Sequence, residues 1–280
     1  MNYSTLIDVA TLAAELDNPA WVVLDCRFDL MNPAWGETEF AAEHIPGAQY
    51  AHLDRDLAGP PTADSGRHPL PDPATFAALA GRWGIDNSTQ VVVHDQAGGV
   101  FAARAWWLFR WLGHERVALL DGGLAAWRAA GLPVTTGGST RPARIFEPKP
   151  DMSRVVGVSD IVAALGSPEL QVVDARGADR FAGQNETMDP RAGHVPGAVN
   201  HPFALNLSSE GRLHEADRLR TAWLATLAGH DPKEMVAMCG SGVSACLNLL
   251  SMEIAGLPGA RLYPGSWSEW VKDPSRPIAQ

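Results

Sequence analysis

The chain carries the same phrases twice, in the same order, and this repetition restricts its fold more than any other feature. The matched segments are 22–27 with 172–176, 43–48 with 193–198, 91–100 with 235–243, and 119–127 with 262–270. Ordered self-similarity of this kind indicates two copies of one structural unit. A length of 280 residues gives each copy enough chain to bury a core of its own.

Each half alternates short runs rich in β-branched residues with longer periodic segments, such as 101–112 and 244–255. This order of strand, helix and strand is typical of an α/β domain with a parallel central sheet. Residues 135–150 are rich in Gly, Pro and Thr and have little apolar periodicity, which indicates a connection. We therefore predict domains at 1–134 and 154–280, joined by a linker at 135–153.

Composition excludes several classes of function. Hydrophobic residues make up 46% and charged residues 19% of the chain, and no apolar run has the roughly 18 residues of a membrane span. The net charge of −10 disfavours nonspecific binding to nucleic acid or to anionic membranes. Because the amino terminus lacks the basic start and apolar stretch of a secretory signal, we expect a cytoplasmic protein.

The three cysteines are odd in number and have no CxxC spacing, which argues against a disulfide framework and against a cysteine-rich zinc site. Cys239 follows an apolar run and precedes a glycine-rich turn and a helical segment. Turn N–H groups and a helix N-terminus favour a thiolate there, so Cys239 is the candidate nucleophile. The first half has Asp95 at the matched position, so only the second half can use a thiolate. We expect Cys26 and Cys246 to be core residues.

Together these motifs resemble those of the tandem rhodanese-type sulfurtransferases, along nearly the whole chain. The markers are Asp-x-Arg at Asp25 and Asp174, two His-x-Pro-Gly-Ala turns, Leu-Asp-Gly-Gly at 120–123, Gly-Ser-Trp-Ser-Glu-Trp at 265–270, and the cysteine loop. The resemblance implies two similar rhodanese-like domains, each a mainly parallel β-sheet flanked by helices, with a single active cysteine in the second. It also implies ping-pong transfer of sulfur through a cysteine persulfide, with no metal or organic cofactor.

The composition of the cysteine loop points to a sulfur donor. Family members that favour thiosulfate typically have basic residues after the cysteine, which match a dianion, whereas Gly240, Ser241 and Gly242 are uncharged. The loop resembles the Cys-Gly-Ser-Gly-Val-Thr loop of 3-mercaptopyruvate sulfurtransferases, with Ser244 in place of threonine. This implies 3-mercaptopyruvate as donor, release of pyruvate, and a persulfide anion stabilised by the backbone N–H groups of the loop. Those groups belong to Gly240, Ser241, Gly242, Val243 and Ser244.

The acceptor implied is a thiol, such as thioredoxin or a small thiol, or cyanide. Two alternatives stay open at this point: thiosulfate as the donor, and a persulfide carrier that delivers sulfur to a protein partner. A cysteine phosphatase is disfavoured because such loops normally end in an arginine six residues after the cysteine, where this chain has Ala245. A noncatalytic module fits the first half alone, since that half lacks the cysteine.

The resemblance also implies roles for residues outside the loop. Ser241 is expected to handle protons together with His68 and with Asp54, or Asp56 as the alternative. Arg180 and Arg191 are expected to bind the carboxylate of the donor, because a guanidinium matches its two oxygens. The plainer interpretations are a loop-capping role for His68 and solvated loop positions for the arginines. Arg27 and Arg176 are expected to pair with nearby carboxylates, and His44 and His194 to be structural because each half has one.

Overall fold

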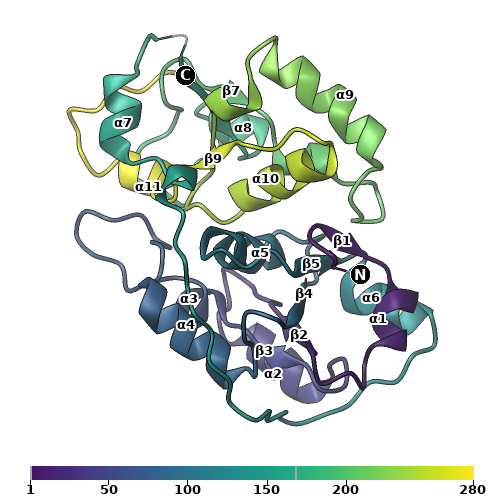
Figure 1. The fold of residues 1–280 in the computed structure, drawn as a ribbon. Coiled ribbons are helices and arrows are strands. Elements are labelled where there is room, and N and C mark those ends of the chain that lie inside the picture. Colours follow the sequence, from purple (N-terminus) through teal and green to yellow (C-terminus); the bar gives the residue numbers. More distant parts are fainter. Residues whose placement is uncertain (1, 168) are drawn as a thin grey trace. The chain divides into compact units, whose positions relative to one another are not determined.

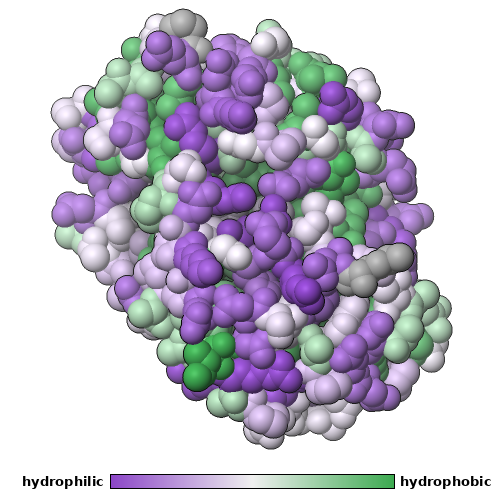
Figure 2. Space-filling view, in the orientation of Figure 1, coloured by the Kyte–Doolittle hydropathy of each residue, from purple (hydrophilic) through white to green (hydrophobic). Residues whose placement is uncertain are grey.

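The computed structural model describes residues 2–167 and 169–280, which form two compact units. The first unit comprises the residues up to Gly59 together with Pro71–Asp151, and the second comprises Pro60–Leu70 together with Met152–Gln280. Within the described ranges no helix has both the length and the apolar character that a membrane span needs. Figure 2 shows hydrophilic residues over much of one face, with smaller hydrophobic areas between them.

The first unit is a parallel sheet with the strand order β1-β5-β4-β2-β3. Its strands are β1 (Leu6–Ile7), β2 (Trp21–Asp25), β3 (Gln49–Tyr50), β4 (Gln90–His94) and β5 (Val117–Leu120). The helices around it are α1 (Val9–Ala14), α2 (Trp35–Ala42), α3 (Leu53–Asp56), α4 (Pro73–Arg82), α5 (Ala102–Trp111) and α6 (Gly123–Ala129).

The second unit is a parallel sheet with the strand order β7-β6-β8-β9. Its strands are β6 (Gln171–Asp174), β7 (Val199–Asn200), β8 (Met235–Met238) and β9 (Arg261–Leu262). Its helices are α7 (Val158–Ala163), α8 (Ala178–Phe181), α9 (Ala216–Leu227), α10 (Ala245–Ile254) and α11 (Ser266–Trp270), with 3-10 turns at Met152–Arg154, Phe203–Asn206 and Pro232–Glu234. The predicted α/β class with two similar parallel-sheet domains is confirmed.

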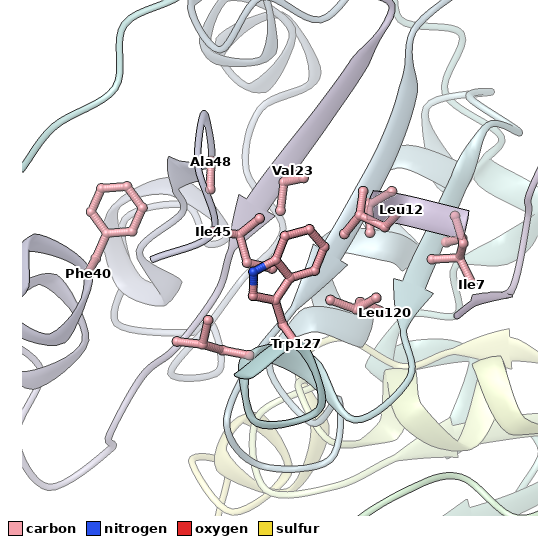
Figure 3. Close-up of a cluster of buried hydrophobic side chains, with 11 residues drawn as sticks. Ile7, Leu12, Val23, Phe40, Ile45, Ala48, Leu120 and Trp127 are labelled. Atoms are coloured by element: carbon pink, nitrogen blue, oxygen red, sulfur yellow. The ribbon is translucent and has the colours of Figure 1, made fainter. Parts of the chain in front are cut away.

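The repetition in sequence is also a repetition in packing. Figure 3 shows the indole of Trp127 among Val23, Ile45 and Leu120 in the core of the first unit, and Trp270 lies in the corresponding core of the second. Both indoles are fully buried, and each donates its N–H to a backbone carbonyl, that of Pro133 at 2.7 Å and that of Pro277 at 2.9 Å. Buried tryptophans in most proteins pair their N–H with an acceptor, and Trp127 and Trp270 do so in the same way.

The units differ from the predicted domain ranges in two respects. Residues 135–151, predicted as a linker, pack on the first unit through backbone hydrogen bonds such as Arg144 N–H to the Gly81 carbonyl and Lys149 N–H to the Leu112 carbonyl, each 2.9 Å. Residues 60–70 pack on the second unit, where Lys272 donates to the Thr62 carbonyl at 2.9 Å. The second unit therefore includes a segment that the sequence assigns to the first domain.

Candidate active site

Cys239 lies directly after β8 and ahead of α10, at the floor of the glycine-rich loop. Its side chain is buried, with 2% of the residue exposed, and its Sγ accepts the N–H of Gly242 at 3.1 Å. Gly242 has φ +77°, and a Cβ there would lie 2.4 Å from the Pro264 carbonyl oxygen. Only glycine allows both this backbone conformation and this close approach, so Gly242 fixes the turn that brings its N–H to the sulfur.

The backbone of Cys239 is held by the turn at the start of α11. Cys239 donates its N–H to the Ser266 hydroxyl at 3.1 Å, and its carbonyl accepts the N–H of Trp267 at 3.0 Å. The carbonyl of Gly240 accepts the N–H of Ser268 at 2.9 Å. Ser266 itself has φ +54°, a left-handed conformation that costs a residue with a side chain about 1–3 kcal/mol. The repeat phrase at 265–270 thus has a structural role beside the cysteine.

The loop after Cys239 contains backbone N–H groups that have no partner in the described part of the chain. The N–H groups of Gly240, Ser241, Val243 and Ser244 make no hydrogen bond to any other residue that the structure describes. Buried backbone donors are nearly always paired, so a group of unpaired N–H donors around one buried sulfur is unusual in a structural loop. The arrangement suits an anion bound above Cys239.

Ser241 and His68 are brought together although they are far apart in sequence. Ser241 Oγ and His68 Nδ1 lie 2.7 Å apart, at hydrogen-bond distance, and both residues are buried. The segment that carries His68 is anchored to the second unit by the N–H of Arg67, which donates to the Ser268 hydroxyl at 3.0 Å. The neighbouring Gly66 lies so close to Gly265 that a Cβ on it would stand 2.4 Å from that carbonyl oxygen.

The two candidate aspartates lie on α3 in the first unit. The carboxylate of Asp56 accepts the N–H of His52 at 2.8 Å, and burial raises its pKa. Asp54 lies in the first turn of the same helix and is exposed. Of the two, Asp56 therefore serves its own helix end, whereas Asp54 presents its side chain at the surface.

Two arginines flank Gly240, the residue that follows Cys239. Measured from the point where a Cβ on Gly240 would stand, Arg67 Nη2 is 3.0 Å away and both terminal nitrogens of Arg180 are 3.8 Å away. Arg180, on α8, binds Glu186 through its Nε at 3.1 Å and its Nη2 at 2.8 Å. Asp189 accepts from Arg67 Nη1 and lies 3.5 Å from Arg180 Nη2. The sequence prediction included Arg180 but missed Arg67, which is next to His68 on the same anchored segment.

The other predicted residues are placed as follows. The guanidinium of Arg191 donates to the Asp273 carbonyl at 3.4 Å, and no contact joins it to Gly240 or Arg180 among the described residues. Arg27 and Arg176 pair with Asp25 and Asp174, each 2.7 Å apart, which confirms their predicted structural role. His44 and His194 stack on Phe40 and Phe181, and their Nδ1 atoms lie 2.7 and 2.9 Å from the carbonyls of the same two phenylalanines.

The matched loop of the first unit contains an anion of its own. The carboxylate of Asp95 accepts four backbone N–H groups at 2.7–2.8 Å, from Ala97, Gly99, Phe101 and Ala102. Burial raises the pKa of Asp95, while these hydrogen bonds oppose that effect. This loop is fully occupied by a side chain of the protein itself.

Comparison with known proteins agrees with these features. The model of the rhodanese-like domain matches the chain twice, at residues 8–130 and 158–273. A probable 3-mercaptopyruvate sulfurtransferase of Pseudomonas aeruginosa is 48% identical over 100% of this chain and 99% of its own length. A putative thiosulfate sulfurtransferase of Mycobacterium tuberculosis is 36% identical over 92% of this chain and 90% of its own. The structure of a 3-mercaptopyruvate sulfurtransferase from Leishmania major superposes with a TM-score of 0.85 at 30% identity, covering 95% of this chain and 74% of that one.

Proposed function

This chain belongs to the family of proteins built from rhodanese-like domains, and on that premise we propose that it transfers sulfur from 3-mercaptopyruvate to an acceptor through a persulfide on Cys239. The observation that carries the proposal is the cysteine loop. A buried sulfur already accepts one backbone N–H, and four further N–H groups of the same loop have no partner among the described residues. Such a loop stabilises the terminal sulfur of a persulfide anion better than it stabilises the shorter thiolate alone.

The first half-reaction follows from thiol chemistry. The Cys239 thiolate attacks the sulfur of the donor, an S–S bond forms, and the bond between sulfur and C3 breaks with its electron pair left on carbon. The carbanion is the enolate of pyruvate. The enolate takes one proton at C3, which balances the proton that the donor's thiol loses. Pyruvate then leaves, and the persulfide anion stays on the enzyme.

Ser241 and His68 are the groups we assign to this proton transfer. Their hydrogen-bond distance of 2.7 Å supports a path from the hydroxyl to the imidazole, whose ordinary pKa is near neutrality. Asp54 stays the predicted carboxylate partner of His68, with Asp56 as the alternative; Asp56 accepts the N–H of His52 at the start of α3. A relay of this kind supplies typically 10²–10⁴-fold in rate.

The donor's carboxylate is assigned to Arg180, because its guanidinium lies beside Gly240, the residue after the nucleophile. Arg191 is the other predicted carboxylate ligand, and that role stays a prediction. The uncharged loop supports a donor with one negative charge. Thiosulfate, with two, is the second candidate, and one relative carries the name of a putative thiosulfate sulfurtransferase.

In the second half-reaction an acceptor attacks the outer sulfur and releases the Cys239 thiolate. A thiol such as thioredoxin or a small thiol becomes a persulfide, whereas cyanide becomes thiocyanate. Cys26, Cys239 and Cys246 form no disulfide with one another in the described part of the chain. A cytoplasmic location and the identity of the acceptor stay predictions.

The test is a paired assay of both donors with one small thiol as acceptor. We expect a higher kcat/KM for 3-mercaptopyruvate than for thiosulfate, steady release of pyruvate, and no activity of Cys239→Ser with either donor. A higher kcat/KM for thiosulfate would overturn the choice of donor. Pyruvate release that stops after one equivalent, whatever the small thiol, would favour the persulfide carrier over a freely turning enzyme.

A further inference from the structure

Arg67 occupies a position beside the nucleophile that neither the sequence motifs nor the mechanism above uses. Its Nη2 is the side-chain atom nearest to the point where a Cβ on Gly240 would stand, at 3.0 Å, and Arg180 Nη1 lies 3.8 Å from the same point. Two guanidinium groups from distant segments thus converge on the residue next to Cys239. Both are partly exposed, at 32% and 25% of the side chain, so a ligand in solvent can reach them.

The opposite edges of the two guanidinium groups are held by buried carboxylates. Asp189 binds Arg67 Nη1, and Glu186 binds Nε and Nη2 of Arg180, with only 3% and 2% of these acidic side chains exposed. Although burial alone raises the pKa of Glu186, the Arg180 guanidinium and the Met188 N–H lower it below its usual value, so this carboxylate is ionised at neutral pH. The acidic pair fixes the orientation of both arginines.

The edges that face Gly240 are left with unused donors. Arg67 Nη2 and Arg180 Nη1 make no hydrogen bond or ion pair with any residue in the described ranges. A planar anion with two oxygens matches one N–H from each. Arg191, by contrast, directs its guanidinium to the Asp273 carbonyl.

We propose that Arg67 and Arg180 together form the carboxylate-binding site for the donor, with Arg67 in the place that the sequence assigns to Arg191. This rests on the proposed function. Because Asp189 and Glu186 already balance the two positive charges, the site offers oriented hydrogen bonds with little net charge. It therefore selects a carboxylate with one negative charge, because each of the two oxygens meets one N–H donor. A dianion is disfavoured because its extra charge would lie near two buried carboxylates.

The test compares Arg67→Gln with Arg191→Gln, and uses Arg218→Gln, an exposed arginine on α9, as the matched control. We expect Arg67→Gln to lower kcat/KM for 3-mercaptopyruvate about 10–100-fold, the effect of one lost hydrogen bond to a charged group, mostly through KM. Arg67→Lys should recover part of the loss, because the charge is kept but the planar fork is not. The reaction of preloaded persulfide enzyme with a neutral thiol should stay within about threefold of wild type.

A second variant tests the preference between the two donors, and this test remains possible if Arg67→Gln folds poorly. Asp189→Asn removes one negative charge without changing size, so the ratio of kcat/KM for thiosulfate to that for 3-mercaptopyruvate should rise about tenfold. If the wild-type enzyme releases no pyruvate, the proposed function fails. If it does, but Arg191→Gln raises KM while Arg67→Gln does not, or the donor ratio of Asp189→Asn is unchanged, the assignment of Arg67 is wrong.

Discussion

The loop after β4 and the loop after β8 occupy matched positions in the two halves of the sequence but bind negative charge differently. In the first, the Asp95 carboxylate takes four backbone N–H groups. In the second, Cys239 Sγ takes one, and further N–H groups of the loop stay unpaired within the described part of the chain. The loop with Asp95, called the inactive loop, already binds a carboxylate of the chain. In the proposed function the loop with Cys239, called the active loop, keeps its donors for an anion that forms during the reaction. The loop geometry is therefore that of an anion site in both halves.

The turns that support these two loops differ in the residue that adopts a left-handed conformation. Gly123 in the first half and Ser266 in the second have nearly the same left-handed φ, +55° and +54°. Glycine adopts this conformation without cost. The space at Gly123 also requires glycine, because a Cβ there would lie 2.5 Å from the Asp95 carbonyl oxygen. The active half accepts the strain of a serine, and the hydroxyl of that serine holds the N–H of Cys239. Backbone strain is thus found in the half that contains Cys239.

Converting the active loop into the inactive type should have the largest effect. In Cys239→Asp the carboxylate takes the loop N–H groups and no nucleophile is left, so we expect turnover to fall at least about 10⁴-fold. Thermal unfolding should occur no earlier than in wild type. The matched control is Cys246→Ala, which should keep kcat within about threefold. Residual pyruvate release above the uncatalysed rate would show that another group attacks the donor.

Emptying the inactive loop should destabilise the protein without affecting catalysis. Asp95→Ala leaves four backbone donors without their acceptor, and we expect the free energy of unfolding of the first unit to fall by about 3 kcal/mol. Chemical denaturation measures this, with the exposed Asp17→Ala as the control. The kcat of the folded protein should not change. A loss below about 1 kcal/mol would mean that water forms hydrogen bonds with these N–H groups and that the loop is not an anion-binding site.

Removing the hydroxyl of Ser241 tests a feature that the first half lacks, since Ala97 stands at the matched position. Ser241→Ala should lower kcat for pyruvate release about 100-fold, because the proton path to His68 is broken. The pH dependence of kcat near neutrality should flatten as well. Ser159→Ala, on the exposed side of α7, is the control. An unchanged pH profile would show that Ser241 has only a structural role in the turn and takes no part in proton transfer.

Replacing Ser266 by the glycine of the inactive half should have the smallest effect. Ser266→Gly removes the acceptor for the Cys239 N–H but also the backbone strain, so we expect about a tenfold loss in kcat with little change in stability. Ser266→Ala keeps the strain and should be less stable than Ser266→Gly. Equal kcat for Ser266→Gly and wild type would show that the hydroxyl does not position the nucleophile.

The sequence predicts most of the fold because the relevant signals are local or repeated. The buried runs at β4 and β8, the periodic segments of α5 and α10 and the paired Asp-x-Arg motifs need only nearby residues to be recognised. The pairing of His68 with Ser241 came from the family resemblance, and the structure brings the two together. Their roles in the reaction stay predictions.

The remainder depends on contacts that leave no pattern in the chain. Residues 60–70 lie outside the four matched phrases, and hydrogen bonds such as that from the Arg67 N–H to Ser268 hold them to the second unit without any periodicity in the sequence. For the same reason no motif in the sequence indicates that Arg67 lies beside Gly240. Residues 135–151 are held by backbone hydrogen bonds, which any sequence can make. An extended polar segment therefore looks like a free linker although it is packed.

The most direct test of the account is a single-turnover experiment that locates the transferred sulfur. The protein is mixed with 3-mercaptopyruvate without an acceptor, pyruvate is quantified, and peptides are analysed by mass spectrometry. We expect one equivalent of pyruvate and a mass increase of one sulfur atom on the peptide that contains Cys239. Sulfur on Cys26 or Cys246, or pyruvate without any persulfide, would contradict it.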